Sequence, residues 1–398
     1  MLNKNSYPVI KLQKGKDEAV KRFHPWIFSG AIQQIPKQLS AGEIVFVLDH
    51  QEQLLGTAFY EGGNIALKML SFSKEVIDYN FWLRKISVAL KLREQLGLLN
   101  NASTTAWRLV HSEGDGLPGL IVDIYGTTAV FQAQSAGMYL HRNAIASAIV
   151  ELMQGQIKAV YDKSAEALER MDKTAGLNEY IIGEAGDNIV LENGLSFFVD
   201  WERGQKTGFF LDQRDARSML KKYSAGRKVL NTFSYSGGFS VAALKGDAEF
   251  VVSVDSSKKA IELCDRNIQL NEFESRHQSV CAETKKYLEI MNPADFDVIV
   301  LDPPAFAKNH HNRHKGLQGY KYINFEAIRK IAPGGLLFTF SCSQAVDRQS
   351  FQSIVMAAAI ETGRSVQLLH HLSQPPDHPV SIYHPEGAYL KGLVLRVG

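Results

Sequence analysis

The sequence has few cysteines and no long apolar run. Its three cysteines, Cys264, Cys281 and Cys342, form no Cys-x-x-Cys pair. An odd number at this spacing excludes a zinc knuckle and a disulfide framework, and indicates reduced thiols. No stretch approaches the ~18 consecutive apolar residues of a membrane span, and the first 16 residues carry four lysines without the apolar core of a signal peptide. We therefore expect a soluble, cytoplasmic protein with no membrane partner.

An excess of charge of one sign is also lacking. Lys and Arg total 44 against 42 Asp and Glu, which leaves a net charge of +2. This balance excludes a polyanion binder that works by bulk charge, although it permits a local basic surface. The 45% hydrophobic and 22% charged residues are ordinary for a globular chain and exclude disorder. At ~150 residues per domain, the length of 398 residues predicts two or three domains.

The order of predicted elements favours three domains. Residues 1–75 read as short strands separated by turns, which is typical of a small β domain. Residues 76–187 begin with a helix at about 80–98 and continue as a mixed α+β domain. Residues 188–398 open with a β-hairpin at Asn193-Gly194 and then alternate strand and helix. This alternation predicts an α/β fold with a parallel, doubly wound sheet, whose ligands bind at the carboxyl ends of the strands.

A turn of small residues follows the predicted strand that ends at Asn231. It lacks Gly-x-Gly-x-x-Gly, so the dinucleotide fingerprint is not met. Asp255 closes the next strand 24 residues later, where a carboxylate can accept hydrogen bonds from ribose hydroxyls. Together with Asp302-Pro-Pro at a later strand tip, this combination favours a nucleoside cofactor. The alternative is that Gly237 and Gly238 only permit a tight turn and that Asp255 caps a helix.

Asp302 and Cys342 are the candidate catalytic residues. Two prolines after Asp302 cannot continue a strand, so the carboxylate should stand at the strand tip. Cys342 follows the next predicted strand at the same edge. A thiol beside a carboxylate suits methyl transfer to C5 of a pyrimidine, because thiolate addition at C6 activates C5 and a base then removes the C5 proton. A buried, inert thiol is the alternative, and we favour it for Cys264 and Cys281.

Two cationic segments could contact RNA phosphates. Lys21, Arg22 and Trp26 lie in the first, where the aromatic residue could stack on a base or belong to the core. The second runs from Lys308 to Lys321 with four positive charges and no acid, and a solvated loop is its other interpretation.

Potential metal ligands are few in the sequence pattern. The closely spaced histidines of the second cationic segment, His310, His311 and His314, have no accompanying Cys or acidic residue, so we expect no metal. Glu113 and Asp115 resemble a pair of catalytic acids, but their glycine-rich setting between two strands predicts a hairpin loop.

Six segments together resemble the PUA-domain-containing class I methyltransferases. They are His24 to Gly30, Glu113 to Asp123, Gly204 to Arg214, Asn231 to Ser240, Asp302 to Phe306 and Ser341 to Ser343. The resemblance runs essentially end to end, and residues 205–214 are its most specific element. Bacterial members methylate C5 of a cytosine in large-subunit ribosomal RNA with S-adenosylmethionine.

The resemblance implies an N-terminal PUA domain, a central α+β domain and a C-terminal Rossmann-like methyltransferase domain. It implies Cys342 as nucleophile and Asp302 as the carboxylate that holds the cytosine edge. The implied cofactor-binding residues are Phe210, Gln213, Asn231, Phe233, Ser234, Ser236, Gly237, Gly238, Phe239, Asp255, Ala282, Asp302 and Pro303. The expected RNA-binding residues are Lys206, Lys308, Arg313, Lys315, Lys21, Arg22 and Trp26.

The expected partner is 23S ribosomal RNA or a pre-ribosomal particle, and a homodimer stays open. Two departures stand out: Cys281-Ala282 where the family usually has an acidic residue that contacts adenine, and Ala305 where a lysine is frequent. Backbone amides or Glu283 could hold the adenine instead. Two other functions also stay open: guanine N-methylation by the same fold, which needs no thiol, and a non-catalytic RNA-binding assembly factor.

Overall fold

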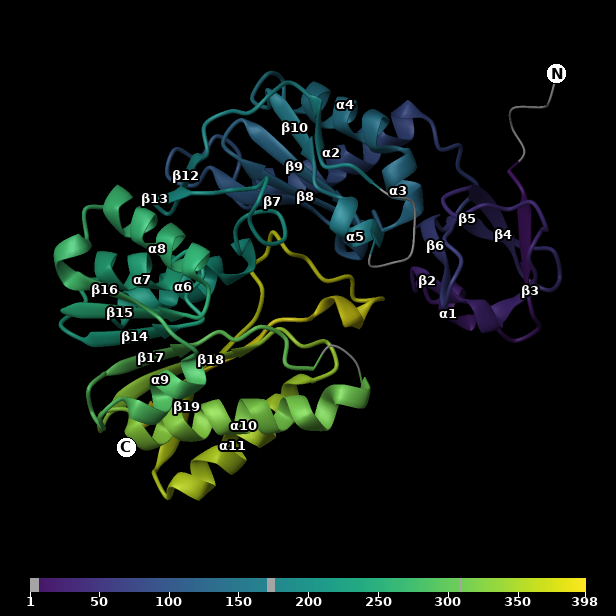
Figure 1. Cartoon of the computed structure of the whole chain (residues 1–398). Helices are drawn as coiled ribbons and strands as arrows, with labels where there is room; N and C mark the ends of the chain where they lie inside the picture. Colours follow the sequence, from purple (N-terminus) through teal and green to yellow (C-terminus); the bar gives the residue numbers. More distant parts are fainter. Residues whose placement is uncertain (1–6, 170–175, 308–309) are drawn as a thin grey trace. The chain divides into compact units, whose positions relative to one another are not determined.

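The computed structural model describes residues 7–169, 176–307 and 310–398 (Figure 1). By their contacts these residues form two compact units. Within the described residues, the first unit comprises 7–169, 176–190, 199–209 and 376–387, and the second comprises 191–198, 210–307, 310–375 and 388–398. The predicted third domain, residues 188–398, thus contributes three short segments to the first unit: 188–190, 199–209 and 376–387. The division into three domains stays a prediction.

The first sheet contains six strands in the order β2-β6-β5-β4-β1-β3. The strands are β1 (Val9–Leu12), β2 (Trp26–Phe28), β3 (Ile32–Gln34), β4 (Ile44–Leu48), β5 (Leu54–Tyr60) and β6 (Ile65–Ser71), and a single helical turn, α1 (Glu18–Lys21), follows β1. Alternate residues such as Ile10 and Leu12 are fully buried because the side chains of a strand point to opposite faces. They form the core of this small β domain.

A five-stranded sheet in the order β11-β10-β9-β8-β7 follows along the chain. Its strands are β7 (Ala106–His111), β8 (Leu120–Tyr125), β9 (Thr128–Ala133), β10 (Ala159–Asp162) and β11 (Glu179–Ile182). The accompanying helices are α2 (Tyr79–Gln95), α3 (Ala136–Leu140), α4 (Arg142–Leu152) and α5 (Ala165–Glu169). Asp78 begins α2 by accepting a 2.9 Å hydrogen bond from the Phe81 amide. Glu113 and Asp115 lie in the turn between β7 and β8, so the predicted hairpin loop is confirmed.

The second unit contains a seven-stranded sheet in the order β16-β15-β14-β17-β18-β20-β19. Its strands are β14 (Lys228–Thr232), β15 (Phe250–Asp255), β16 (His277–Cys281), β17 (Val298–Leu301), β18 (Gly335–Ser341), β19 (Val366–Leu372) and β20 (Lys391–Val397). The first five pair in parallel, and β20 runs antiparallel to both β18 and β19. The hairpin β12 (Ile189–Glu192) and β13 (Leu195–Phe198) precedes this sheet and turns at Asn193 and Gly194, whose φ angles are 51° and 76°. The predicted doubly wound sheet is confirmed.

Helices cover both faces of this sheet (Figure 1). Helices α6 (Arg214–Lys222), α7 (Gly238–Lys245) and α8 (Lys258–Leu270) lie on one side, and α9 (Thr284–Ile290), α10 (Arg313–Lys330) and α11 (Arg348–Thr362) lie on the other. The loop interpretation of the second cationic segment is wrong from Arg313 onward, since α10 begins there. Glycine weakens a helix prediction, but a Cβ on Gly316 would lie 2.7 Å from the Ala307 Cβ. Close packing therefore explains that glycine.

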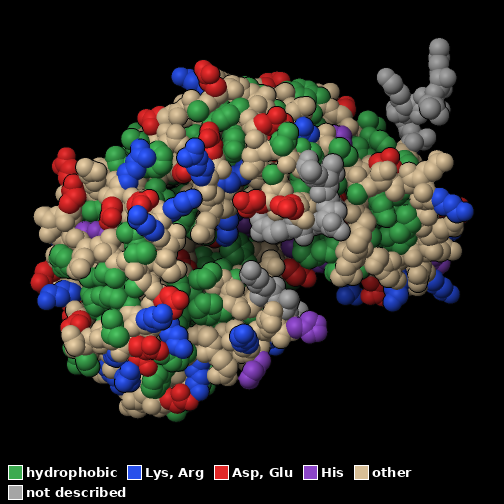
Figure 2. All heavy atoms as spheres, viewed as in Figure 1, with side chains coloured by type: hydrophobic (Ala, Val, Ile, Leu, Met, Phe, Trp, Pro, Cys, Tyr) green, Lys and Arg blue, Asp and Glu red, His purple; other side chains and the backbone are tan. Residues whose placement is uncertain are grey.

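Surface charge agrees with the balanced composition. On the face drawn in Figure 2, Lys and Arg side chains alternate with Asp and Glu side chains. Among the residues that the structure describes, no helix is long and apolar enough to cross a membrane.

Candidate active site

The order of strands in the second unit reverses at β14. The chain goes from β14 to β15 and β16 on one side and then returns to β17 on the other. Ligands of such sheets bind outside the carboxyl ends of the strands at this switch point. The turn from Phe233 to Gly237 follows β14 at that position.

This turn has a strained backbone and a glycine that cannot be replaced. Phe233 and Tyr235 have φ angles of 54° and 43°, and Gly237 has 74°. A Cβ on Gly237 would lie 2.5 Å from the Cys264 Sγ. Gly237 therefore permits the tight turn, which the sequence analysis gave as the alternative to a role in cofactor binding. Burial raises the pKa of Cys264 to about 12, which agrees with an inert thiol.

Asp255 joins two loops at the tip of β15. Its Oδ2 accepts a 3.0 Å hydrogen bond from the Tyr235 amide, and its Oδ1 accepts a 2.9 Å bond from the Ser257 amide. Ser257, not Asp255, caps α8, because its side chain accepts from the Ala260 amide. The helix-cap interpretation of Asp255 is therefore wrong.

A cavity of about 530 Å³ opens beside these loops. Its walls come from the turn after β14, the tips of β15 and β16, the segment after Asp302, and α10. The lining residues are Phe233, Ser256, Glu283, Thr284, Lys285, Phe306, Gln318, Gly319, Tyr322 and Ile323. The volume and the mixture of aromatic and polar walls suit a small organic ligand.

Several buried polar atoms around this edge lack a hydrogen-bond partner. They are Gln213 Oε1, Asn231 Oδ1, Ser234 Oγ and Thr284 Oγ1. Buried polar groups in native proteins are nearly always paired, so these atoms indicate a polar ligand at the carboxyl ends of β14 and β16. The donor and acceptor groups fit a nucleoside cofactor.

Gln213 links the 210–217 segment to the tip of β17. Its Nε2 donates a 3.0 Å hydrogen bond to Asp302 Oδ1, across 89 residues of sequence. The Phe210 ring packs edge-on against Tyr235 at 5.2 Å between centroids. Arg217 holds this segment, since its guanidinium donates to the Phe210 carbonyl at 3.0 Å and to both oxygens of Glu192 at 2.6 Å.

Cys342 lies next to the Asp302-Pro-Pro segment. Leu301 of β17 pairs with Thr339 of β18, so the two strand tips are neighbours. The half-buried Cys342 Sγ lies 3.9 Å from the Pro303 carbonyl oxygen. Ser343 fixes the loop, because its Oγ accepts from the Ala307 amide at 3.2 Å and lies 2.8 Å from the Tyr320 hydroxyl.

Lys391 is a residue of this site that sequence reasoning missed. Its buried ammonium donates to the carbonyls of Ser343 and Tyr389 at 2.6 and 2.7 Å. Burial lowers the pKa of Lys391 to about 8, against the opposing effect of the neighbouring Cys342. The signal in the sequence was a lysine at the start of the strand Lys391–Val397, followed directly by four residues without charge, Gly392 to Leu395.

Other expected cofactor-binding residues also make contacts inside the second unit. Phe239 is buried and packs against Phe340 at 5.6 Å, because it lies on the side of α7 that covers the sheet. Asn231 Nδ2 donates to Ser240 Oγ at 2.8 Å, and the carbonyl of buried Ser236 accepts from Asn267 Nδ2 at 2.9 Å. Gly238 packs against Arg217, whose Cδ would lie 3.1 Å from an added Cβ. Ala282 is half-buried beside the cavity, and its amide donates to the Asp255 carbonyl at 2.9 Å.

Most of the expected RNA-binding cations in the described residues have acidic neighbours. Lys21 pairs with Asp17 and with Asp49, and the hydrogen bond to Asp17 raises the pKa of Lys21. The remaining contacts are Arg22 with Glu18 at 3.4 Å, Trp26 Nε1 with Glu113 at 2.8 Å, and Arg313 with Asp347 at 2.8 Å. Lys206 and Lys315 are exposed, and Lys308 lies outside the described residues. The RNA-binding role of these residues stays a prediction.

Comparisons with known proteins identify the family of the chain. Residues 150–396 match the model of the S-adenosylmethionine-dependent methyltransferase family, and residues 10–72 match a PUA-like domain. A protein of Salmonella typhi named ribosomal RNA large subunit methyltransferase I is 37% identical over 98% of each chain. A protein of the same name from Salmonella schwarzengrund is 37% identical over 99% of this chain and 98% of its own.

Two solved structures share the fold. The first is a SAM-dependent methyltransferase from Streptococcus mutans, with 23% sequence identity and a TM-score of 0.84. The match covers 98% of this chain and 100% of the other. The second is the methyltransferase SMU.776 in complex with SAH, with 24% sequence identity and a TM-score of 0.82. This match also covers 98% of this chain and 100% of the other. The chain therefore belongs to the S-adenosylmethionine-dependent methyltransferases, in the family that carries an N-terminal PUA-like domain.

Proposed function

We propose that the protein forms 5-methylcytosine in 23S ribosomal RNA, with S-adenosylmethionine as methyl donor. The relatives named as large-subunit ribosomal RNA methyltransferases support the substrate class, since 37% identity extends over 98% of both chains. One observation supports C5 of cytosine as the methylated atom: Cys342 Sγ lies 3.9 Å from the Pro303 carbonyl oxygen, so a thiol lies beside the strand end that carries Asp302. We also propose that the reaction takes place in the cytoplasm, on free RNA or a pre-ribosomal particle.

The cofactor, when bound, supplies an electrophilic methyl group. The residues that would hold it are Asp255 at the ribose hydroxyls, Phe233 and Glu283 along the cavity wall, and Gln213 near Asp302. Gln213 Oε1 and Ser234 Oγ are buried without partners and are therefore ready to bond a ligand. The carboxylate of Asp255 keeps lone pairs beyond the two amides that it accepts.

Cys342 acts as the nucleophile. Its thiolate forms a bond to C6 of the cytosine, and the electrons of the C5–C6 double bond then make C5 nucleophilic toward the methyl group. Removal of the C5 proton restores the double bond while the S–C6 bond breaks and the thiolate leaves. Asp302 holds the cytosine edge and assists the proton transfer, with its orientation set by Gln213.

Lys391 acts as a positioning residue for this thiolate. Its ammonium bonds the carbonyl of Ser343, the residue directly after Cys342. A cation near a thiol favours the thiolate over the neutral form, whose ordinary pKa is ~8.5. The buried position makes this effect stronger than it would be in water.

Covalent trapping tests the proposal. A 23S ribosomal RNA fragment that contains 5-fluorocytosine cannot lose a proton from C5, so the adduct to Cys342 should persist and be seen as a shifted band under denaturing conditions. Cys342→Ser should abolish the band, whereas Cys281→Ser should keep it. Methyl transfer to guanine without any adduct would favour the guanine N-methylation alternative and overturn the cytosine mechanism. Failure to bind S-adenosylhomocysteine in a calorimetric titration would favour the non-catalytic assembly factor.

A further inference from the structure

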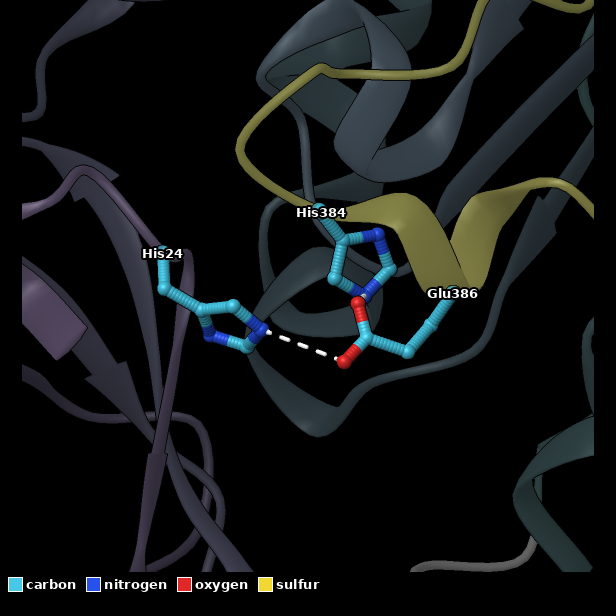
Figure 3. Close-up of side chains that lie close together, drawn as sticks. All are labelled: His24, His384 and Glu386. Atoms are coloured by element: carbon cyan, nitrogen blue, oxygen red, sulfur yellow. Dashed lines mark ion pairs between the residues drawn. The ribbon is translucent and has the colours of Figure 1, made fainter.

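A second cluster of chemically capable side chains lies in the first unit, apart from the residues of the methyl-transfer site. His24 precedes β2, and His384 and Glu386 come from the 376–387 segment. One nitrogen of each histidine and one oxygen of Glu386 lie within 4.8 Å of one another. In Figure 3 the Glu386 carboxylate lies between the two imidazole rings, with a different oxygen toward each ring.

The distances inside this cluster are too long for hydrogen bonds. His24 Nε2 lies 3.6 Å from Glu386 Oε1, and His384 Nε2 lies 3.7 Å from Glu386 Oε2. A side-chain contact of 3.6 Å does not qualify as a hydrogen bond. Two ligands of one tetrahedral zinc ion, with bonds of ~2.0–2.2 Å, lie about 3.3 Å apart. Small side-chain rotations would shorten the 3.6 and 3.7 Å separations to this ligand–ligand distance.

His384 is a buried side chain that lacks a hydrogen-bond partner. It is 3% exposed, and neither of its ring nitrogens makes a hydrogen bond. Trp26 covers it at 4.3 Å between ring centroids. A buried imidazole whose ring nitrogens have no hydrogen-bond partner is available to bind a metal ion.

His24 has the backbone support that is common for metal-binding histidines. Its Nδ1 lies 3.2 Å from the Trp26 carbonyl oxygen. In the tautomer that donates this bond, Nε2 presents its lone pair toward Glu386, and a backbone carbonyl behind a histidine ligand is a frequent arrangement at metal sites. The Trp26 amide, 3.1 Å from Nδ1, can be satisfied only in the other tautomer, so metal binding selects between the two.

We propose that His24, His384 and Glu386 bind a divalent transition metal of the zinc class. Two imidazoles, one carboxylate and a water make a four-coordinate site that suits this class. The 52% exposed Glu386 side chain gives the ion a path from solvent. The ion would join the segment before β2 to the 376–387 segment, two parts of the first unit that lie about 360 residues apart in sequence. This inference is independent of methyl transfer and revises the expectation that no metal is bound.

Metal binding to the full-length protein tests the inference. We expect protein stripped with a chelator to take up one Zn²⁺ per chain in equilibrium dialysis, and Co²⁺ in its place to give the visible absorption of a tetrahedral site. His384→Ala and Glu386→Gln should each weaken binding at least about 10-fold, because loss of a direct ligand should cost no less than loss of a supporting residue. Zn²⁺ should also raise the thermal midpoint of the wild type but not of these variants.

Two controls separate this site from other histidines. His371, an exposed histidine of β19, offers a matched His371→Ala control that should bind zinc as the wild type does. Circular dichroism with chelator present checks that each variant is folded, and His24→Ala provides an independent variant if His384→Ala is not. The proposal is wrong if no saturable binding occurs, or if binding survives His384→Ala and is lost instead in a His311→Ala, His314→Ala double variant.

Discussion

Arg93 in the first unit and Gln213 in the second are both buried polar side chains, yet their hydrogen bonding differs. Arg93 is 0% exposed and donates to both oxygens of Asp115 at 2.5 and 2.8 Å. It also donates to the carbonyls of Ala89, Arg108 and Asp377 at 3.3, 2.8 and 2.8 Å. Gln213 uses its amide nitrogen on Asp302 and leaves Oε1 without a partner.

The difference separates structural from functional polar groups. A fully satisfied buried cation such as Arg93 rigidifies its surroundings, and removal of its partner is costly. Gln213, Ser234 and Thr284 instead have buried polar atoms without a hydrogen-bond partner, and we propose that the bound cofactor supplies the missing partners. The same criterion identified His384 in the first unit. Hydrogen-bond accounting therefore predicts which substitutions affect stability and which affect activity.

The largest effect should come from Cys342. Cys342→Ser should lower the methylation rate at least about 1,000-fold, since loss of a nucleophile removes the covalent route. Stability should stay within about 0.5 kcal/mol, as for a substitution that disturbs no core packing. Tritium transfer from labelled cofactor measures the rate. A rate within 10-fold of wild type would show that no covalent step through this thiol is needed.

Arg93 should affect stability alone. Arg93→Met leaves Asp115 buried without its cation, which should lower the free energy of unfolding of the first unit by about 3–5 kcal/mol. All four tryptophans, Trp26, Trp82, Trp107 and Trp201, belong to the first unit, so urea unfolding followed by tryptophan fluorescence reports on it. The exposed pair of Arg84 and Glu75 is the matched control, and Arg84→Ala should cost no more than about 1 kcal/mol.

His277 should make the second unit sensitive to acid. Burial lowers the pKa of His277 to about 4, while its Nε2 lies 2.7 Å from Ser253 Oγ. Between pH ~6.5 and 4 the unfolded chain binds a proton that the folded chain does not, so stability falls as the pH falls, by up to about 3 kcal/mol. His277→Gln should remove this loss, as measured by hydrogen exchange of β15 and β16 amides at several pH values. An equal acid dependence in both proteins would refute the role.

Lys391 should change the pH dependence of the reaction. Lys391→Gln keeps a donor for the Ser343 carbonyl but removes the positive charge near Cys342. If the apparent pKa of the thiol then rises by about one unit, the rate at pH 7 falls about 10-fold and recovers at higher pH. A loss that is the same at every pH would indicate a structural role only.

Local patterns predicted the second unit well. Apolar runs predicted the strands of one parallel sheet; they end in Asn231, Asp255, Asp302-Pro and Ser341-Cys342. Because ligands bind at the carboxyl ends of such strands, the sequence alone predicted that Asp302 and Cys342 lie close together. The helix from Arg313 was missed because glycine and histidine obscure its period, and their tertiary packing is not readable from the segment itself.

Local patterns could not predict contacts between residues that lie far apart in the sequence. Lys391 reaches Ser343 because β20 pairs antiparallel with β18, and no local period predicts which strand is the neighbour. His24 meets Glu386 because the 376–387 segment belongs to the first unit although its flanking residues belong to the second.

The sequence by itself determined the alternation of strand and helix and the positions of Asp302 and Cys342 at two strand tips, because each depends on residues near one another in the chain. Only the tertiary structure decided which polar groups are satisfied. That property depends on every neighbour in space: it distinguished Arg93 from Gln213, placed a cation beside Cys342, and left His384 without a hydrogen-bond partner.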